Sequence, residues 1–246
     1  MIIKRTWLAL FPVFVIATAP AVAQDGSDIQ WSVTPSAWFP DTTVDLALQD
    51  TNVGSGKIRF SDVLDVVDIG FMLQVEGGRG SWSGFSDLTY VSTSDTTERE
   101  FLTVDADNEQ ILVDAAVAYW PKGVGSPLSL FGGIRYSGLD GQYRISLDDT
   151  ELGTQRSGEN YTDVLLGVRY RFDFADRWSL LARADYSAGD SEGSFLLRAN
   201  LAYAVGQRQQ NRFIFGYQHR QAEYRDGDLT LDMRLSGFVA GYSFRF

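Results

Sequence analysis

Apolar side chains occupy every second position in several long runs of this chain, and this alternation limits what the chain can fold into. In residues 164–174 the apolar members are Val164, Leu166, Val168, Tyr170, Phe172 and Phe174. The same period returns in residues 111–119, 180–186 and 195–205. A two-residue period is typical of a β-strand with one apolar and one polar face. The runs approach the ~9–11 residues of a tilted membrane-spanning strand, whereas strands in soluble sheets usually have about 5–6 residues.

The connections between these runs alternate between short and long. Short, turn-like joints lie at residues 77–80, 121–127, 175–177 and 206–211. Longer polar segments lie at residues 40–67, 94–108 and 139–160, with two shorter ones near Asp190 and Asp226. Transmembrane β-barrels have this arrangement, with short turns at the periplasmic end and longer loops outside the cell.

Ten strands fit between these connections. We expect them at residues 28–39, 68–78, 81–93, 108–120, 128–139, 160–174, 177–189, 194–206, 211–224 and 229–246. An even number returns both chain ends to the periplasm. Eight or twelve strands also remain open, because residues 43–48, 56–60, 143–147 and 152–156 could form loop hairpins or extend the barrel. The predicted fold class is all-β: a transmembrane, antiparallel, up-and-down β-barrel with short periplasmic turns and long acidic extracellular loops.

The N-terminal residues have the pattern of an export signal. Lys4 and Arg5 precede the apolar run 7–16, and Ala21 and Ala23 are small residues at the two positions that a signal peptidase reads. The apolar run is shorter than the ~20 residues of a spanning helix. We therefore expect residues 1–23 to be a signal peptide, cleaved after Ala23, and residues 24–246 to form one outer-membrane barrel domain.

Composition excludes several classes of function. The 32 acidic residues outnumber the 21 Lys and Arg residues, which disfavours a nucleic-acid partner because such proteins need a basic face. Cysteine is absent, so the chain has no disulfide, thiolate metal site or lipid-modified cysteine. No glycine-rich phosphate loop, histidine cluster or spaced calcium-ligand repeat occurs. We expect no cofactor and no metal.

The last strand ends with an aromatic residue at every second position: Tyr242, Phe244 and Phe246. This pattern resembles the C-terminal signal that the barrel-assembly machinery of Gram-negative bacteria recognises. In its overall pattern, from residue 25 to 246, the chain is similar to small outer-membrane β-barrel proteins of the porin-like and OmpA-like superfamily. The resemblance implies insertion by that machinery, location in the outer membrane, and contact with its lipid and lipopolysaccharide.

The last strand also contains a change of parity. Its apolar residues are odd-numbered up to Leu235 and even-numbered from Phe238 onward. If both sets face lipid, the strand must contain a β-bulge near Ser236 and Gly237.

Aromatic residues suggest a belt at each membrane interface. Those near the short turns or chain ends are Trp31, Trp82, Tyr119, Trp120, Phe172, Phe174, Trp178, Phe244 and Phe246. Those near the long loops are Tyr90, Tyr136, Tyr186, Tyr217 and Tyr224.

If the apolar faces meet lipid, the opposite faces line the lumen and carry charges of both signs. The expected lumen network consists of Glu76, Asp87, Asp114, Arg135, Asp163, Arg169, Arg171, Arg183, Asp185 and Arg198. Opposite charges in a narrow barrel should pair, because an unpaired ion there is costly to desolvate. One interpretation is a constriction that sets the preference for ions or solutes. We favour the other, a salt-bridged plug, because side chains nearly fill barrels of this size.

Catalysis has weaker support. The only histidine is His219, which shares parity with Phe215 and Tyr217 and should face lipid or the outer leaflet. A serine partner cannot be located from spacing, although Glu223 is a candidate to orient the ring. Three functions therefore remain: a structural or passive-pore barrel, a lipid-modifying enzyme at the rim, and a soluble secreted barrel that binds an apolar ligand. The third fails if the apolar faces form an exposed band.

Overall fold

The computed structural model describes residues 29–48, 51–58, 70–99, 102–147, 150–226 and 229–246. The strands are β1 (Gln30–Leu48), β2 (Thr51–Ile58), β3 (Gly70–Arg79), β4 (Trp82–Arg99), β5 (Leu102–Tyr119), β6 (Leu128–Leu147), β7 (Thr150–Ala175), β8 (Trp178–Gly189), β9 (Gly193–Val205), β10 (Asn211–Asp226) and β11 (Leu229–Arg245). Among these described residues, no helix is long and apolar enough to cross a membrane.

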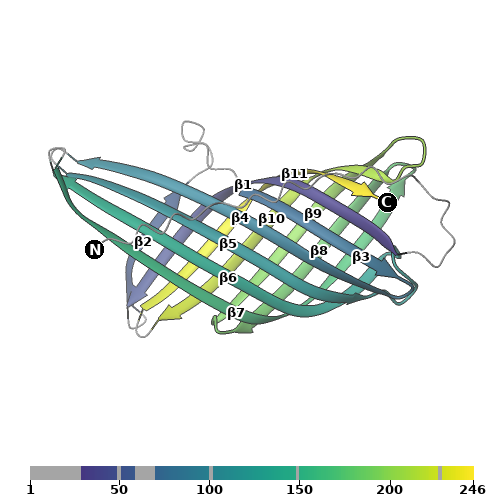
Figure 1. Ribbon diagram of the computed structural model, residues 1–246, viewed down its shortest axis with the longest axis horizontal. Helices are drawn as coiled ribbons and strands as arrows, with labels where there is room; N and C mark the ends of the chain where they lie inside the picture. Colours follow the sequence, from purple (N-terminus) through teal and green to yellow (C-terminus); the bar gives the residue numbers. More distant parts are fainter. Residues whose placement is uncertain (1–28, 49–50, 59–69, 100–101, 148–149, 227–228) are drawn as a thin grey trace, which may run out of the picture.

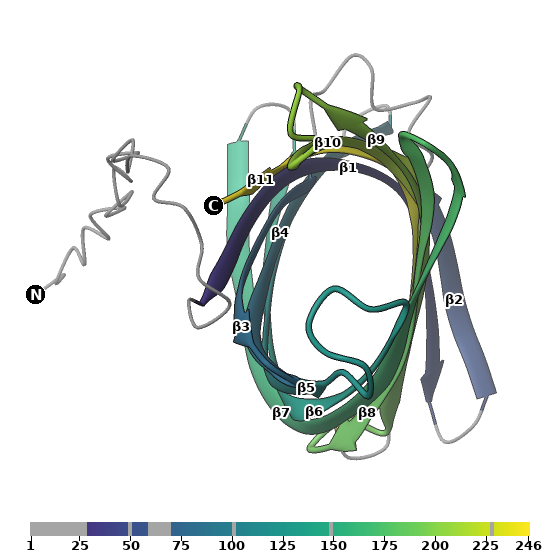
Figure 2. The ribbon, with the colours of Figure 1, turned by 90° about the vertical axis from the view of Figure 1, so that its right-hand side faces the viewer.

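The strands form a closed antiparallel barrel (Figures 1 and 2). From β3 to β11 each strand pairs with the next, and β1 closes the ring by pairing with both β3 and β11. The seam extends to the chain end, because Trp31 and Phe246 exchange two backbone hydrogen bonds of 2.9 and 3.1 Å. Strand β2 pairs with the outer part of β1 and lies outside the wall. The predicted ten-stranded barrel is confirmed.

Most of the polar segments expected to be loops continue as strands beyond the predicted boundaries. In the β4–β5 hairpin, β4 continues to residue 99 and β5 begins at residue 102. In the β6–β7 hairpin, β6 continues to residue 147 and β7 begins at residue 150, so that β7 is 26 residues long. In Figure 1 these strands project farthest from the end that carries the C-terminus. A hairpin outside the membrane can continue in this way because its two strands satisfy each other's backbone hydrogen bonds. The expected signal peptide lies outside the described residues.

Apolar side chains face outward around the barrel. On β7, Val164, Leu166 and Phe172 are 63%, 65% and 53% exposed, while the interleaved Leu165 is buried. Exposed aromatic residues mark both edges of this band, with Trp82 and Phe174 at one edge and Tyr90, Tyr136, Tyr186 and Tyr217 at the other. A continuous outward band removes the alternative of a soluble barrel with its apolar faces inside.

Two residues assigned to the aromatic belts face inward instead. Trp120 donates from Nε1 to Ser83 Oγ at 2.8 Å and packs beside the interior residue Phe85 and its neighbours. Tyr224 is only 2% exposed and packs against Tyr161, with the ring centroids 4.6 Å apart and the rings tilted by 37°. Both belong to the lumen because an inward position in the strand alternation, not nearness to a turn, decides their direction.

The conditional prediction of a β-bulge in β11 is wrong. The pairing of β11 with β1 and with β10 shows no register shift at Ser236 or Gly237. The odd-numbered residues therefore point inward, where Leu235 and Val239 join a buried apolar cluster with Trp38, Met72 and Val91. Gly237 permits close strand packing, because a Cβ there would overlap the carbonyl oxygen of Phe39.

Candidate functional site

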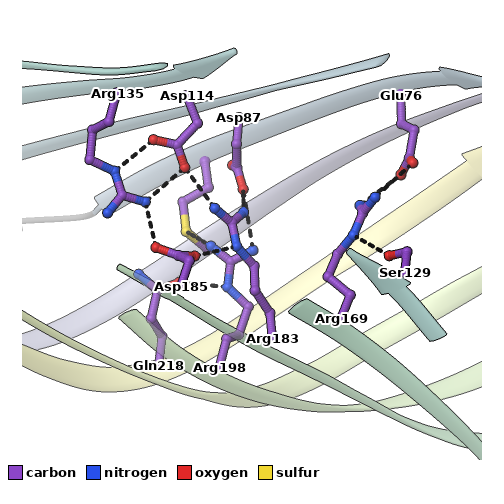
Figure 3. Close-up of polar contacts among 11 residues, drawn as sticks. Glu76, Asp87, Asp114, Ser129, Arg135, Arg169, Arg183, Asp185, Arg198 and Gln218 are labelled. Atoms are coloured by element: carbon purple, nitrogen blue, oxygen red, sulfur yellow. Dashed lines mark hydrogen bonds and ion pairs between the residues drawn. The ribbon is translucent and has the colours of Figure 1, made fainter. Parts of the chain in front are cut away.

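Charged side chains occupy the middle of the lumen (Figure 3). The central network consists of Asp87, Asp114, Arg135, Arg183 and Asp185, all of them buried. These residues come from β4, β5, β6 and β8. Each occupies an inward position, so the alternation that turns apolar side chains toward lipid turns these charges toward one another.

Arg135 holds two of the three carboxylates. Its Nε and Nη2 donate to the two carboxylate oxygens of Asp114 at 2.7 and 2.9 Å. Nη2 also donates to Asp185 Oδ1 at 2.9 Å. The planar guanidinium suits this bidentate geometry. Because Arg135 and Asp114 are directly opposite across β5 and β6, the pair is already specified by the local hairpin.

Arg183 contacts all three carboxylates and joins distant parts of the chain. It donates from Nε to Asp185 at 2.6 Å, from Nη1 to Asp87 at 2.7 Å, and from Nη2 to Asp114 at 2.7 Å. Arg183 and Asp87 are 96 residues apart in sequence. The side chains of the central network are at most 5% exposed. These contacts therefore cross the lumen in a nearly dry environment, where each charge depends on its partners.

Arg198 on β9 extends the network. Its Nε donates to Gln218 Oε1 at 2.6 Å, and its Nη1 lies 3.5 Å from Asp87 Oδ2. Its Nη2 lies 3.7 Å from Met72 Sδ, at the border of the apolar cluster. Arg198 therefore links the charged layer to the apolar layer of the lumen.

Arg169 and Glu76 form a second ion pair nearer the short turns. Two guanidinium nitrogens of Arg169 donate to the two oxygens of Glu76, both at 3.0 Å. Arg169 Nε also donates to Ser129 Oγ at 3.2 Å. The guanidinium lies over the ring of Phe85, 4.6 Å from its centroid, and 5.2 Å from that of Trp120. This pair is 14% and 17% exposed, so it is wetter than the central network.

The other two expected lumen residues have different partners. Asp163 is buried and accepts hydrogen bonds from Ser187 Oγ at 3.1 Å and from Ser191 Oγ at 2.6 Å. It thus anchors the turn between β8 and β9. Arg171 lies near the periplasmic end and pairs at 3.2 Å with Asp173, whose side chain is 52% exposed. Neither residue joins the central network.

Sequence reasoning missed Arg220 and Gln218. Both are buried inward-facing residues of β10, and Arg220 Nη2 lies 3.5 Å from the hydroxyl of Tyr224. Their alternation with the outward Phe215, Tyr217 and His219 was the available signal. It was overlooked because the aromatic face of this strand dominates its pattern.

His219 lies on the outer wall with a serine beside it. Its Nδ1 is 2.6 Å from Ser236 Oγ, directly opposite on β11. The ring of Phe195 lies 5.4 Å from the imidazole centroid. Glu223 is an orienting candidate, yet it pairs with Arg225 at 3.8 Å. The structure therefore brings together a base and a hydroxyl, two of the three groups in a hydrolase triad.

Within the described segments, no group of three or more His, Cys, Asp or Glu side chains is arranged to hold a metal ion. Arginine side chains, and not a metal ion, neutralise the central carboxylates of the lumen.

No family model and no curated protein matches this sequence. The outer membrane protease OmpT of Escherichia coli is similar in structure, with a TM-score of 0.54, 10% identity, and coverage of 92% of this chain and 99% of that one. Ail of Yersinia pestis gives a TM-score of 0.43 at 11% identity, covering 88% of this chain and 99% of that one. A major outer membrane protein of Thermus thermophilus gives a TM-score of 0.39 at 15% identity, covering 89% of this chain and 100% of that one.

The likeness to OmpT shows the fold alone. The location follows from the barrel itself, because its ten wall strands pair in a closed ring and present an apolar band between two aromatic belts. The chain is a small ten-stranded β-barrel protein of the outer membrane.

Proposed function

We propose that this protein is a structural outer-membrane barrel with a sealed lumen, passing at most small ions or solutes. The observation that carries the proposal is Arg183, which binds three carboxylates across the lumen at 2.6–2.7 Å. A ten-stranded barrel has an interior little wider than its side chains, so one crosslinked layer suffices to close it. Membrane lipid surrounds its apolar band, and lipopolysaccharide contacts its outer belt.

Apolar packing on both sides of the central network supports a plug. The cluster that contains Trp38 and Leu235 fills one side of the lumen interior, and a second cluster contains Phe85, Phe131 and Leu165. Solutes would have to displace these side chains as well as break ion pairs. A selective pore would instead leave charged groups hydrated and free to meet the permeating ion.

We expect the purified protein in planar bilayers to show no stable, porin-sized conductance. Arg183→Ala should permit small, noisy currents, because it removes the side chain that joins the three carboxylates. Arg225→Ala is the matched control, since Arg225 is 45% exposed and lies away from the lumen. Steady large conductance from the wild type, with Arg183→Ala changing only ion selectivity, would make the protein a diffusion pore.

A second candidate is an outer-leaflet enzyme that modifies lipid, supported by the 2.6 Å contact between His219 and Ser236. These residues face outward just beyond Tyr217 and Phe238, where the apolar band ends. The similar OmpT structure is named a protease, so the fold accommodates catalysis in that protein. Against this candidate, Nδ1 of the ring points to the serine, and Glu223 pairs with Arg225.

We expect overexpression of the wild type to leave the mass spectrum of lipid A unchanged, and His219→Ala to match it. The reason is that an imidazole without an orienting carboxylate is a poor base for serine. Ser236→Ala serves as the paired control. A lipid A mass shift produced by the wild type and lost in both variants would replace the structural proposal with the enzyme.

A further inference from the structure

The periplasmic half of the lumen contains a cavity of about 160 Å³. Asp87, Arg183 and Arg198 of the charged layer form its inner end. Its other end is bordered by Gly125 and Ser126 of the turn between β5 and β6. Figure 2 shows this turn curling across the barrel opening. The cavity is therefore a blind vestibule, closed toward the outside by the central network.

The turn over the vestibule is held in place. Val124 N donates to the carbonyl oxygen of Gly80 at 2.6 Å, and Trp120 N donates to that of Ser81 at 2.8 Å. At the other end of the turn, Arg171 N donates to the carbonyl oxygen of Pro127 at 2.7 Å. These bonds tie the turn to β3–β4 on one side and to β7 on the other, so the vestibule is a built feature of the fold.

Arginine charge in the vestibule exceeds the charge of its carboxylates. Two carboxylates line it, and both are engaged: Glu76 by Arg169 and Asp87 by Arg183. Arg171 and Arg245 also line the cavity, and Arg171 pairs with the half-exposed Asp173. An excess of positive charge therefore remains at the mouth, in a protein whose formal net charge is −11.

Arg212 adds a third positive charge beside the mouth. It lines a neighbouring cavity, where burial disfavours its charge, Arg245 and Arg171 repel it, and Asp173 attracts it. Its Nε and Nη1 are buried and have no hydrogen-bond partner among the described residues. Confined like charges with unsatisfied hydrogen-bond donors destabilise the folded state unless an anion neutralises them. Arg171 of β7 and Arg245 of β11 thus line the mouth of the vestibule, and Arg212 of β10 lines the neighbouring cavity.

We propose that the vestibule binds a small soluble oxyanion, a phosphate or carboxylate group, from the periplasm. The guanidinium forks of Arg171 and Arg245 supply charge-assisted hydrogen bonds of the geometry that such anions accept. Hydroxyl groups of Ser32, Ser126 and Ser243 line the same cavity and offer further donors. The barrel wall separates the cavity from the membrane, which favours a dissolved anion over a lipid headgroup.

The test uses the full mature barrel, folded in detergent micelles that contain no phospholipid. Its thermal unfolding is followed while sodium phosphate, or sodium succinate, replaces sodium chloride at constant ionic strength. A ligand that binds only the folded state raises the unfolding temperature by mass action. We expect a saturable rise in the wild type, with an apparent affinity at least about tenfold weaker in Arg171→Gln/Arg245→Gln.

Arg225→Gln is the control, because Arg225 is exposed and its partners are Glu192 and Glu223. It should respond like the wild type. Removing two mutually repelling charges should not unfold the barrel, and unchanged heat-modifiable migration on a gel verifies this. A response to either anion that is lost in the double variant supports the site. Equal rises in unfolding temperature in all three proteins overturn the anion site, and so does the absence of any rise over sodium chloride with both anions. Both outcomes are independent of whether the barrel conducts ions.

Discussion

Arg183→Ala is expected to lower the free energy of unfolding by about 3–5 kcal/mol. The substitution leaves three buried carboxylates with two remaining arginines, Arg135 and Arg198, and the Arg198 contact is long at 3.5 Å. The cost arises because the carboxylates stay desolvated after losing a shared partner. Arg135→Ala should be nearly as damaging, since Arg135 is fully buried and binds two of the same carboxylates.

Urea unfolding of the refolded barrel in micelles, followed by tryptophan fluorescence, measures these differences. Arg169→Ala should cost less than Arg183→Ala, because the Arg169–Glu76 pair is more exposed. Arg225→Ala should cost about 0–1 kcal/mol, as exposed ion pairs do. Equal midpoints for Arg183→Ala and Arg225→Ala would mean that water reaches the central network, and the plug would have to be abandoned.

Deletion of Phe246 is expected to reduce the folded protein in the outer membrane several-fold without preventing export. The C-terminal pattern predicts that Phe246 belongs to a signal read by the barrel-assembly machinery after translocation. In the structure its ring is 61% exposed on the wall, and its backbone exchanges hydrogen bonds with Trp31 at the closing seam. The deletion therefore removes an exposed aromatic side chain together with the last backbone hydrogen bonds between the C-terminus and β1.

Phe246→Ala separates these two contributions, because it keeps the backbone pairing and removes only the ring. Phe174→Ala is the control, since Phe174 is a similarly exposed aromatic residue, 51% exposed, that lies away from the C-terminus. The amount of heat-modifiable protein in membrane fractions is the measurement. Wild-type levels in both Phe246 variants would remove the assembly role of the last residue.

The alternation of apolar and polar residues was enough to predict most strands of the barrel wall. Strict alternation in segments such as residues 164–174 determines which side chains face lipid, because a strand turns successive residues to opposite faces. All ten predicted strands occur, and their periplasmic ends lie close to the predicted positions because short turns mark them. The outer ends of β1 and of β4 to β7 were underestimated, since polar sequence can form either a loop or a hairpin that extends beyond the membrane.

The sequence also identified the charges that share the lumen, because an inward position follows from parity. It could not assign their partners. The Arg135–Asp114 contact is local to one hairpin, but Arg183 reaches Asp87 across 96 residues of chain. Likewise Ser236 becomes the neighbour of His219 only through the register of β10 and β11.

Parity by itself, then, determined the two faces of this barrel, whereas closure of the sheet decided what meets inside it. Leu235 illustrates the difference. Its apolar character suggested lipid, yet an unshifted register turns it toward Trp38 in the interior. Apolar side chains are stable both in lipid and in a packed lumen, so their chemistry cannot distinguish the two. Only the strand register, set by pairing along the whole seam, makes that choice.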